Sequence, residues 1–223
     1  MVYHMDISKA KDILDYWFSK GRYTADYDKW FMKSQDYDEE IKEKFGDLLK
    51  EAEQGKGFGW LHTKDSYVAY IILLDQFSRH IYRGNGDSFK NDIGVMIFTD
   101  LGFELYREQL KGYEFMFAFM PYMHTEEFGY QKKGKMIFFD HKSDCELKIR
   151  QISSNITETT VPDLRNLQLE MKMFESMQPH VKGHFETLYK YDRFPKRNEA
   201  LGRKSTPEEI RYMEQPEVKK RPY

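Results

Sequence analysis

The stretch VAYIILLDQFSRHIYR, residues 68–83, decides the fold class of this 223-residue chain. Its first seven residues, Val68 to Leu74, cover about two helical turns without a charged side chain on any face. A helix that is apolar all round is buried on all sides. The sequence therefore predicts a buried central helix over residues 65–82, ended by the turn Gly84-Asn85-Gly86.

The same stretch continues into polar residues, whose hydrogen-bonding and charged groups need partners if the helix is buried. Asp75 and Arg79 stand four residues apart on the face that Val68 and Ile72 begin. Burying a carboxylate and a guanidinium costs several kcal/mol unless each finds a partner. Taken alone, the spacing favours a structural ion pair, with Arg83 solvated beyond the helix, and a bound ligand is the alternative partner.

Helical spacing dominates the rest of the chain. Apolar residues recur at three- and four-residue steps around residues 13–18, 36–55 and 87–106, and again from residue 163. Alternating runs of the kind that form strands are almost absent, so the predicted fold class is all-α. The apolar stripe of the helix over residues 87–106 consists of Ile93, Met96, Ile97, Leu101 and Leu105.

The chain is expected to form one all-helical domain over residues 1–215. Residues 134–162 join a short apolar piece to a polar stretch, which predicts a loop-rich insertion. Pro179 is expected to bend or divide the helix that follows. Residues 216–223, PEVKKRPY, have the composition of a solvated tail.

Composition narrows the classes of function. Lys plus Arg is 35 and Asp plus Glu is 37, and the net charge of −2 argues against a nucleic-acid-binding surface. No apolar run approaches the ~20 residues of a membrane-spanning helix, and no signal segment opens the sequence, so we expect a cytoplasmic protein without a membrane partner. Cys145 is the single cysteine, which excludes an internal disulfide and a cysteine-based zinc site. The glycine patterns of phosphate-binding loops are missing, and no cofactor is predicted.

A second polar cluster ends the aromatic and methionine-rich run from Phe115 to Met123. His124 and Glu126 follow that run, where apolar walls move the pKa values of an imidazole and a carboxyl toward neutrality. Such a pair can act as general acid and base, or can supply two metal ligands. The structural alternative is a helix start, with Thr125 as the N-cap and Glu127 in the first turn.

A third cluster lies between His184 and a predicted helix start at Thr206-Pro207. Arg193, Arg197 and Arg203 stand within eleven residues of one another, in a loop punctuated by proline and glycine. Arginine is the side chain that binds a carboxylate or phosphate with two parallel hydrogen bonds. The cluster is therefore a candidate anion site.

The chain resembles the bacterial family known as domain of unknown function nine-twenty-four. The resemblance implies a tetratricopeptide-like superhelical bundle of antiparallel helices and no established activity. This sequence departs from the family pattern at His80, where Asn is usual, at Asp192, where Gly is usual, and at Lys196, where His is usual. The pieces that carry the resemblance are ILDYWF (13–18), WF (30–31), ILLDQFSRHIYRG (72–84), MHTE (123–126), RFPKRN (193–198) and LGR (201–203).

From these clusters and this resemblance we expect a helix-enclosed pocket for a small anionic ligand that bears a phosphate or a carboxylate. The arginines would grip the anion, while acid–base chemistry, if a reaction such as hydrolysis occurs, would use the imidazoles and a carboxyl group. The expected ligand-binding residues are Asp75, Gln76, Arg79, Arg83, Gln131, Arg193, Arg197, Asn198 and Arg203, and the expected catalytic residues are His124, Glu126 and His184.

Two rival hypotheses remain open at this stage. In the first, the chain is a helical scaffold for a protein or peptide, and the polar clusters are internal struts. In the second, His124, Glu126 and His184 act with Asp75 in metal-dependent hydrolysis. Their spacing matches no standard metal motif, so no metal is assigned.

Overall fold

Residues 64–81 form one continuous helical segment through the core of the computed structural model, which describes residues 5–219. The predicted central helix over residues 65–82 is therefore confirmed. Thr63 caps its start. The Thr63 hydroxyl accepts a hydrogen bond from the Ser66 backbone N–H, and the Ser66 hydroxyl accepts one from the Thr63 backbone N–H. Its middle, Ile72–Phe77, is π-helical, and this wider turn carries Asp75. Such π segments are frequent at functional sites.

The described residues are helical, without a β-strand, so the all-α fold class is confirmed. None of the helices within residues 5–219 has the length and apolar composition needed to cross a membrane. The α-helices are α1 (Lys9–Trp17), α2 (Tyr27–Phe31), α3 (Gln35–Glu53), α4 (Lys64–Ile71), α5 (Ser78–Ile81), α6 (Met96–Tyr106), α7 (Tyr113–His124), α8 (Phe128–Ser153), α9 (Val161–Tyr191), α10 (Pro207–Met213) and α11 (Pro216–Lys219). The shorter segments are η1 (Lys56–His62), η2 (Ile72–Phe77), η3 (Gly86–Phe89), η4 (Arg107–Gln109) and η5 (Pro195–Arg197).

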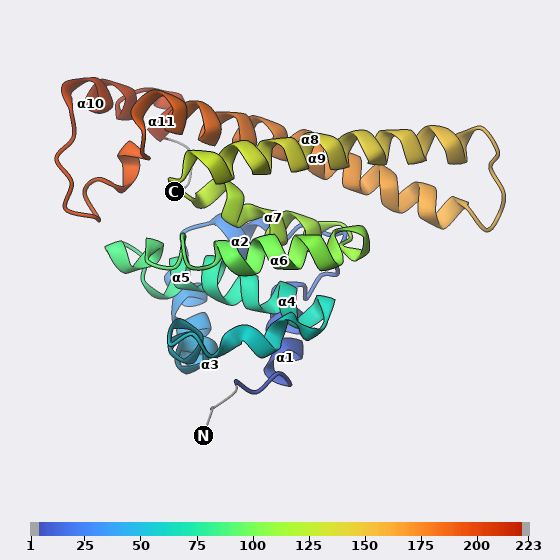
Figure 1. Cartoon of the computed structure of the whole chain (residues 1–223), viewed down its shortest axis with the longest axis horizontal. Coiled ribbons are helices and arrows are strands. Elements are labelled where there is room, and N and C mark those ends of the chain that lie inside the picture. The colour runs from blue at the N-terminus through green and yellow to red at the C-terminus, as the bar shows by residue number, and fades with distance from the viewer. Residues whose placement is uncertain (1–4, 220–223) are drawn as a thin grey trace.

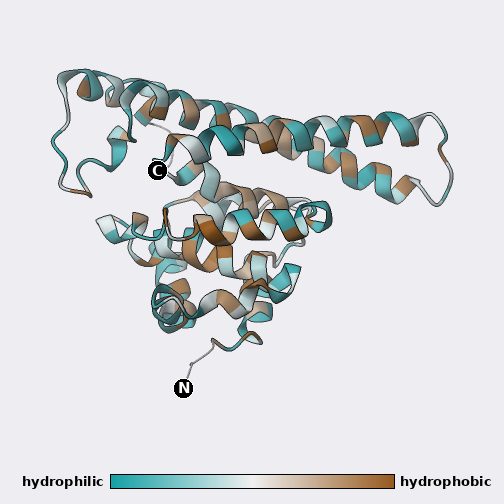
Figure 2. Ribbon diagram, in the orientation of Figure 1, coloured by the Kyte–Doolittle hydropathy of each residue, from teal (hydrophilic) through white to brown (hydrophobic). Residues whose placement is uncertain are grey.

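The helices form two parts that meet along α7. Helices α1 to α7 make a bundle, and the long antiparallel pair α8 and α9 lies across it (Figure 1). A loop over residues 192–206 leads from the end of α9 to α10 and α11, which lie beside the same end of the pair. Figure 2 shows hydrophobic residues concentrated in α6 and α7, whereas hydrophobic and hydrophilic residues alternate along α8 and α9.

The predicted loop-rich insertion at residues 134–162 is wrong for most of its length. Residues 134–153 belong to α8, and only residues 154–160 form a loop before α9. The buried positions of α8 keep the three- and four-residue spacing of a packed helix, but only one of them is a large apolar side chain, which hid the pattern. These positions are Gln131, Gly134, Phe138, His141 and Cys145.

Three further expectations about the helices also fail. α9 is not divided at Pro179, and its rings contact those of α8 on both sides of that residue, Phe174 against Phe138 and Phe185 against Phe128. α11 begins within the expected solvated tail, and its Val218 is buried; residues 220–223 lie outside the described part. The helix expected from residue 87 begins only at Met96, after a short 3₁₀ segment and turns.

The apolar stripe predicted for α6 is largely on the outside. Met96 is buried, but the other four members, Ile93, Ile97, Leu101 and Leu105, are each more than a third exposed. α6 instead buries the face that holds Phe98, Gly102 and Phe103. The reason is Gly102, whose missing side chain lets the Tyr67 ring of α4 lie directly against the α6 backbone.

We expect Gly102→Ala to destabilise the fold by about 1–3 kcal/mol, because the added methyl group would overpack this contact. A Cβ atom built there comes within 2.0 Å of the Tyr67 ring. Gly129→Ala in α8 is the matched control, since a Cβ there meets nothing within 4 Å, and it is expected to be neutral or to stabilise by about 0.5–1 kcal/mol. Urea unfolding of both variants measures the difference, and equal stabilities would contradict the close approach of α4 and α6.

Candidate functional site

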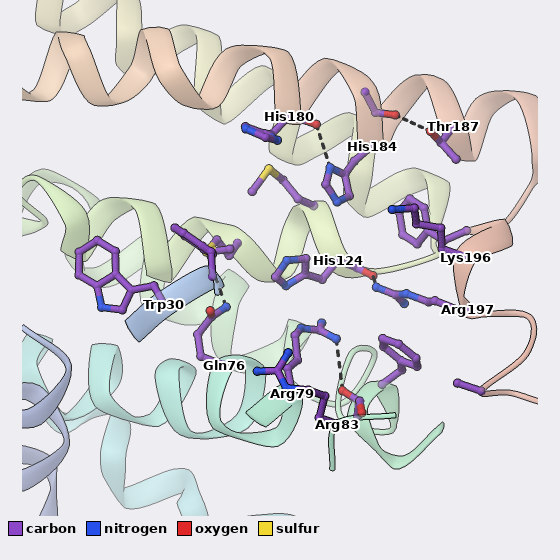
Figure 3. Close-up of a pocket in the computed structure, with 18 of the residues that line it drawn as sticks. Trp30, Gln76, Arg79, Arg83, His124, His180, His184, Thr187, Lys196 and Arg197 are labelled. Atoms are coloured by element: carbon purple, nitrogen blue, oxygen red, sulfur yellow. Dashed lines mark hydrogen bonds between the residues drawn. The ribbon is translucent and has the colours of Figure 1, made fainter. Parts of the chain in front are cut away.

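A cavity of about 840 Å³ lies where the bundle, the α8–α9 pair and the C-terminal segments meet (Figure 3). Its volume is in the range of small-molecule sites. One part of its wall is apolar and comes mainly from α2 and α7. The other part is basic and comes from the end of α5, the second half of α9 and η5. The charged and imidazole residues of the wall are Arg79, His80, Arg83, His124, His180, His184, Lys196, Arg197 and Glu199.

Asp92 joins two arginines that lie far apart in the sequence. The Asp92 carboxylate accepts one hydrogen bond from Arg79 and one from Arg197, each with an N–O distance of 2.7 Å. Arg79 also bonds to Asp75, four residues before it, with an N–O distance of 3.2 Å. Because Asp92 stands in the turns before α6 and Arg197 in η5, this carboxylate ties the loop after α9 to the bundle.

Aromatic rings fix the plane of the Arg197 guanidinium. Its central carbon lies 4.3 Å from the centroid of the Phe89 ring and 4.7 Å from that of Phe194. The same guanidinium donates a hydrogen bond of 2.8 Å to the backbone carbonyl of His124. Burial lowers the pKa of Arg197, but the neighbouring Asp92 opposes that shift, and the side chain stays cationic at neutral pH.

His124 is buried and bonded to Asp75 through one ring nitrogen. Nδ1 lies 2.8 and 2.9 Å from the two Asp75 carboxylate oxygens. Burial raises the pKa of Asp75, but the charges of His124 and Arg79 outweigh it and bring this pKa to about 2. Burial lowers the pKa of His124 below its usual value. At neutral pH Asp75 is therefore ionised, and His124 is neutral with its proton on Nδ1, which leaves Nε2 as a hydrogen-bond acceptor.

His184 repeats this arrangement from α9. Its Nδ1–H donates to the backbone carbonyl of His180 over 2.8 Å, one helical turn earlier. Burial, with His124 nearby, lowers the pKa of His184 to about 3, so its Nε2 is also unprotonated. The centroids of the His124 and His184 rings are 6.2 Å apart. The wall thus holds two neutral imidazoles of fixed tautomer. Figure 3 shows both rings together with Arg79, Arg83 and Arg197 around the pocket.

The structure brings half of the twelve predicted residues to the cavity wall. Asp75 is buried behind His124 and Arg79 and does not line the cavity itself. Arg83 lies on the wall, but it also binds Asp38 of α3, together with His80. The predicted residues on the wall are Gln76, Arg79, Arg83, His124, His184 and Arg197.

Glu126, predicted as a catalytic partner of His124, lies outside the wall. Its carboxylate accepts hydrogen bonds from Arg203, over 2.7 and 3.0 Å, and from the Phe194 backbone N–H, over 2.7 Å. Burial raises the pKa of Glu126, but the hydrogen bonds from Arg203 and the Phe194 N–H outweigh this effect and lower the pKa, so the carboxylate is ionised. Glu126 and Arg203 therefore hold the loop over residues 192–206 against the start of α8.

The remaining predicted residues also hold backbone segments in place. The Gln131 amide donates to the carbonyl groups of Met123 and Thr125 at the end of α7. Arg193 forms two hydrogen bonds with Glu209 of α10, and Asn198 donates to Ser205. Asp192 ends α9 with a φ angle of +57°, a conformation that glycine adopts most easily.

The residues of the metal-dependent alternative do not form a metal site in the described structure. Glu126 faces Arg203 rather than the two imidazoles. Within residues 5–219, no group of three or more His, Cys, Asp or Glu side chains is placed to hold a metal ion.

Sequence reasoning missed Asp92 and the aromatic pair around Arg197. Asp92 was placed inside a predicted helix, and nothing in its local sequence marks it as the partner of an arginine 105 positions away. His180 carried a usable signal, because it stands four residues before His184 on a helix and therefore shares its face.

Comparison with known proteins adds a family and a fold relative. A family model described as "Bacterial protein of unknown function (DUF924)" matches residues 13–217. A solved structure of a protein of unknown function from Agrobacterium tumefaciens aligns with 93% of this chain and 97% of its own, at 26% sequence identity and a TM-score of 0.67. Among curated proteins, none matches this sequence.

We expect Asp92→Asn to destabilise the protein by about 3–5 kcal/mol. Arg197 would lose its carboxylate partner, and Arg79 would keep only Asp75. Asp47→Asn is the matched control, since Asp47 pairs with Lys50 at the surface and its side chain is 97% exposed. That change is expected to stay below about 1 kcal/mol. Urea unfolding at neutral pH measures both, and a loss for Asp92→Asn as small as the control's would show that Asp92 is dispensable.

Proposed function

This chain belongs to the bacterial DUF924 family, whose function is unknown, and from its cavity we propose that it binds a small organic anion bearing a carboxylate or a phosphate. The observation that carries the proposal is the charge of the wall. Arg79, Arg83, Lys196 and Arg197 line the cavity, and Glu199 is the single carboxylate among the described residues of the wall. The aspartates that balance the arginines, Asp38, Asp75 and Asp92, stand behind them.

The arginines are built to bind an anion without losing their present partners. A guanidinium has five N–H donors. Arg197 uses one terminal nitrogen for Asp92 and the other for the His124 carbonyl. Because the rings of Phe89 and Phe194 already hold its plane, ordering the side chain adds little entropic cost to binding. Arg197 is only 7% exposed, and a charge-assisted hydrogen bond is stronger at a buried group than in water.

A second candidate function is hydrolysis with His124 as the general base, and the Asp75–His124 hydrogen bond favours it. A carboxylate that fixes the proton on Nδ1 leaves Nε2 free to take a proton from water, and it stabilises the imidazolium that forms. His184 supplies a second acceptor close by. Glu126 is omitted from this proposal, because Arg203 and the Phe194 N–H already use its carboxylate.

The scaffold alternative draws support from the residues that lie off the wall. Glu126 with Arg203, and Arg193 with Glu209, are struts between helices and loop. A tetratricopeptide-like superhelix, together with a cytoplasmic location, would suit a protein that binds a peptide in a groove. Loss of folding in Arg79→Ala does not distinguish the two functions, since Arg79 is needed between Asp75 and Asp92 in either case.

Anion binding is tested by calorimetry and thermal shift with inorganic phosphate, phosphoenolpyruvate, benzoate and hexanoate. At least one is expected to bind with a dissociation constant below a millimolar. Arg197→Gln is expected to weaken it tenfold or more, the loss of about one charged hydrogen bond. Arg83→Gln, on a partly exposed part of the wall, gives a second variant if Arg197→Gln does not fold.

The matched control for the binding test is Arg193→Gln. Arg193 is also ion-paired but does not line the cavity, so its loss is expected to leave binding unchanged. Absence of binding by all four anions at millimolar concentration would contradict the proposed function. Equal weakening by Arg193→Gln and Arg197→Gln would place the anion elsewhere.

Hydrolysis is tested with p-nitrophenyl butyrate and p-nitrophenyl phosphate. Because the pKa of His124 is lowered, the unprotonated base persists as the pH falls, and the rate is expected to stay level from pH 8 to below 6.5. His124→Asn is expected to reduce the rate at least a hundredfold. His62→Asn is the control, since His62 belongs to η1 and does not line the cavity. Rates equal to those of the uncatalysed reaction would remove this second function.

A further inference from the structure

We infer that the ligand of this cavity is a medium-chain aliphatic carboxylate, whose head lies at the arginines and whose chain lies along the methionines. This inference rests on the proposed anion-binding function and adds the chemical class of the ligand. It comes from the shape of the wall: the cavity is basic at one end and apolar at the other. Figure 3 shows Trp30 at the end opposite Lys196 and Arg197, with His124 between them.

Helix α7 presents a row that changes from apolar to polar. Met116, Met120 and His124 all line the cavity, and they follow one another at four-residue steps, so they lie on one face of the helix. Both methionines are more than nine-tenths buried. The row leads from the apolar end toward the carbonyl of His124, to which Arg197 is bonded.

Helix α9 presents the same order independently. Ser176 and Met177 come first on its cavity-facing side, followed by His180 and then by His184 one turn later. α7 and α9 both pass from thioether to imidazole in the direction of the chain. Two helices that are separated in sequence by α8 therefore build one amphipathic cavity, which suits a ligand with one charged end and one apolar end.

Two polar groups near the apolar end already have partners within the protein. The indole N–H of Trp30 donates to the Trp17 carbonyl over 3.0 Å. The amide of Gln76 donates to Asp75 and contacts the sulfur of Met120. Methionine side chains are flexible and polarizable and adapt to an unbranched chain. A nucleotide or sugar phosphate would place hydroxyl groups against the methionine side chains, whose thioether sulfur is only a weak hydrogen-bond acceptor.

The length of the methionine row sets the length of the chain. Met116 and His124 are eight residues apart, which is about 12 Å along a helix. A fully extended chain advances about 1.2 Å per bond, so about ten bonds, or a chain of roughly ten carbon atoms, fill the row. We therefore expect decanoate to fit best.

The test is calorimetry with acetate, butanoate, hexanoate, octanoate, decanoate and dodecanoate. The dissociation constant is expected to fall about fourfold for each methylene that is buried, and to stop falling near ten carbons. Decyltrimethylammonium, a cation with a chain of the same length, is expected not to bind. Equal binding of this cation would show that the basic end has no role and would overturn the inference.

A variant that shortens the cavity is expected to change the chain length that binds best, which a loss of stability alone would not do. Met116→Trp is expected to move the best chain length down by several carbons, while butanoate binding stays within threefold. Met136→Trp is the matched control, because Met136 lies on the outer face of α8 and is 59% exposed. If Met116→Trp does not fold, Met120→Gln replaces it, with an expected loss of at least tenfold for decanoate only.

The outcomes separate this inference from the function on which it rests. If no carboxylate and no phosphate binds, the proposed function fails. If phosphate and acetate bind as tightly as decanoate, the anion site stands, and the inference of an aliphatic chain is overturned. An unchanged chain-length optimum in Met116→Trp would also overturn it.

Discussion

The carboxylate of Asp92 is the constraint on which the rest of the site depends. It accepts hydrogen bonds from two arginines that stand 13 positions before it and 105 positions after it. Without it, the two largely buried guanidinium groups would lie near each other and repel. A buried charge is costly unless it is paired and hydrogen-bonded, and Asp92 meets that requirement for both arginines at once. The loop that follows α9 is thereby fixed to the bundle, and this closes one side of the cavity.

The chain of charged groups then extends from Asp92 to the imidazoles. Arg79 donates hydrogen bonds to both Asp92 and Asp75, and Asp75 accepts the hydrogen bond from the Nδ1–H of His124. Each member fixes the ionisation state or the tautomer of the next. The aspartates do not line the cavity, whereas the arginines and the two imidazole rings do. The same contacts that hold the parts together therefore place the basic groups on the wall and keep their carboxylate partners off it.

Outside the cavity, a second set of ion pairs has a different role. Glu126 with Arg203, and Arg193 with Glu209, fasten the loop over residues 192–206 to α8 and α10. These pairs use the same residue types as the cavity wall, in the same stretch of sequence. What separates them is their position: these pairs lie off the cavity wall, where their carboxylates bind arginine and backbone N–H groups of the protein itself.

The fold was more predictable than the site because periodicity is a local property. The central helix and the all-α class followed from apolar spacing, and the Asp75–Arg79 pair followed from a four-residue step. Prediction failed where small or polar residues occupy buried positions, as Gly134, His141 and Cys145 do in α8. It also failed on α6, where Gly102 turns a face other than the most apolar one toward the core.

The sequence alone determined that this protein is built of helices around a buried apolar segment, and that acids and bases would have to be paired inside it. Only the tertiary structure decided which arginines share a cavity with the two imidazoles. Helical spacing fixes the face of a side chain about its own axis, over a few residues. The partner of that side chain is set by packing between segments that lie a hundred positions apart, and no local pattern records that distance.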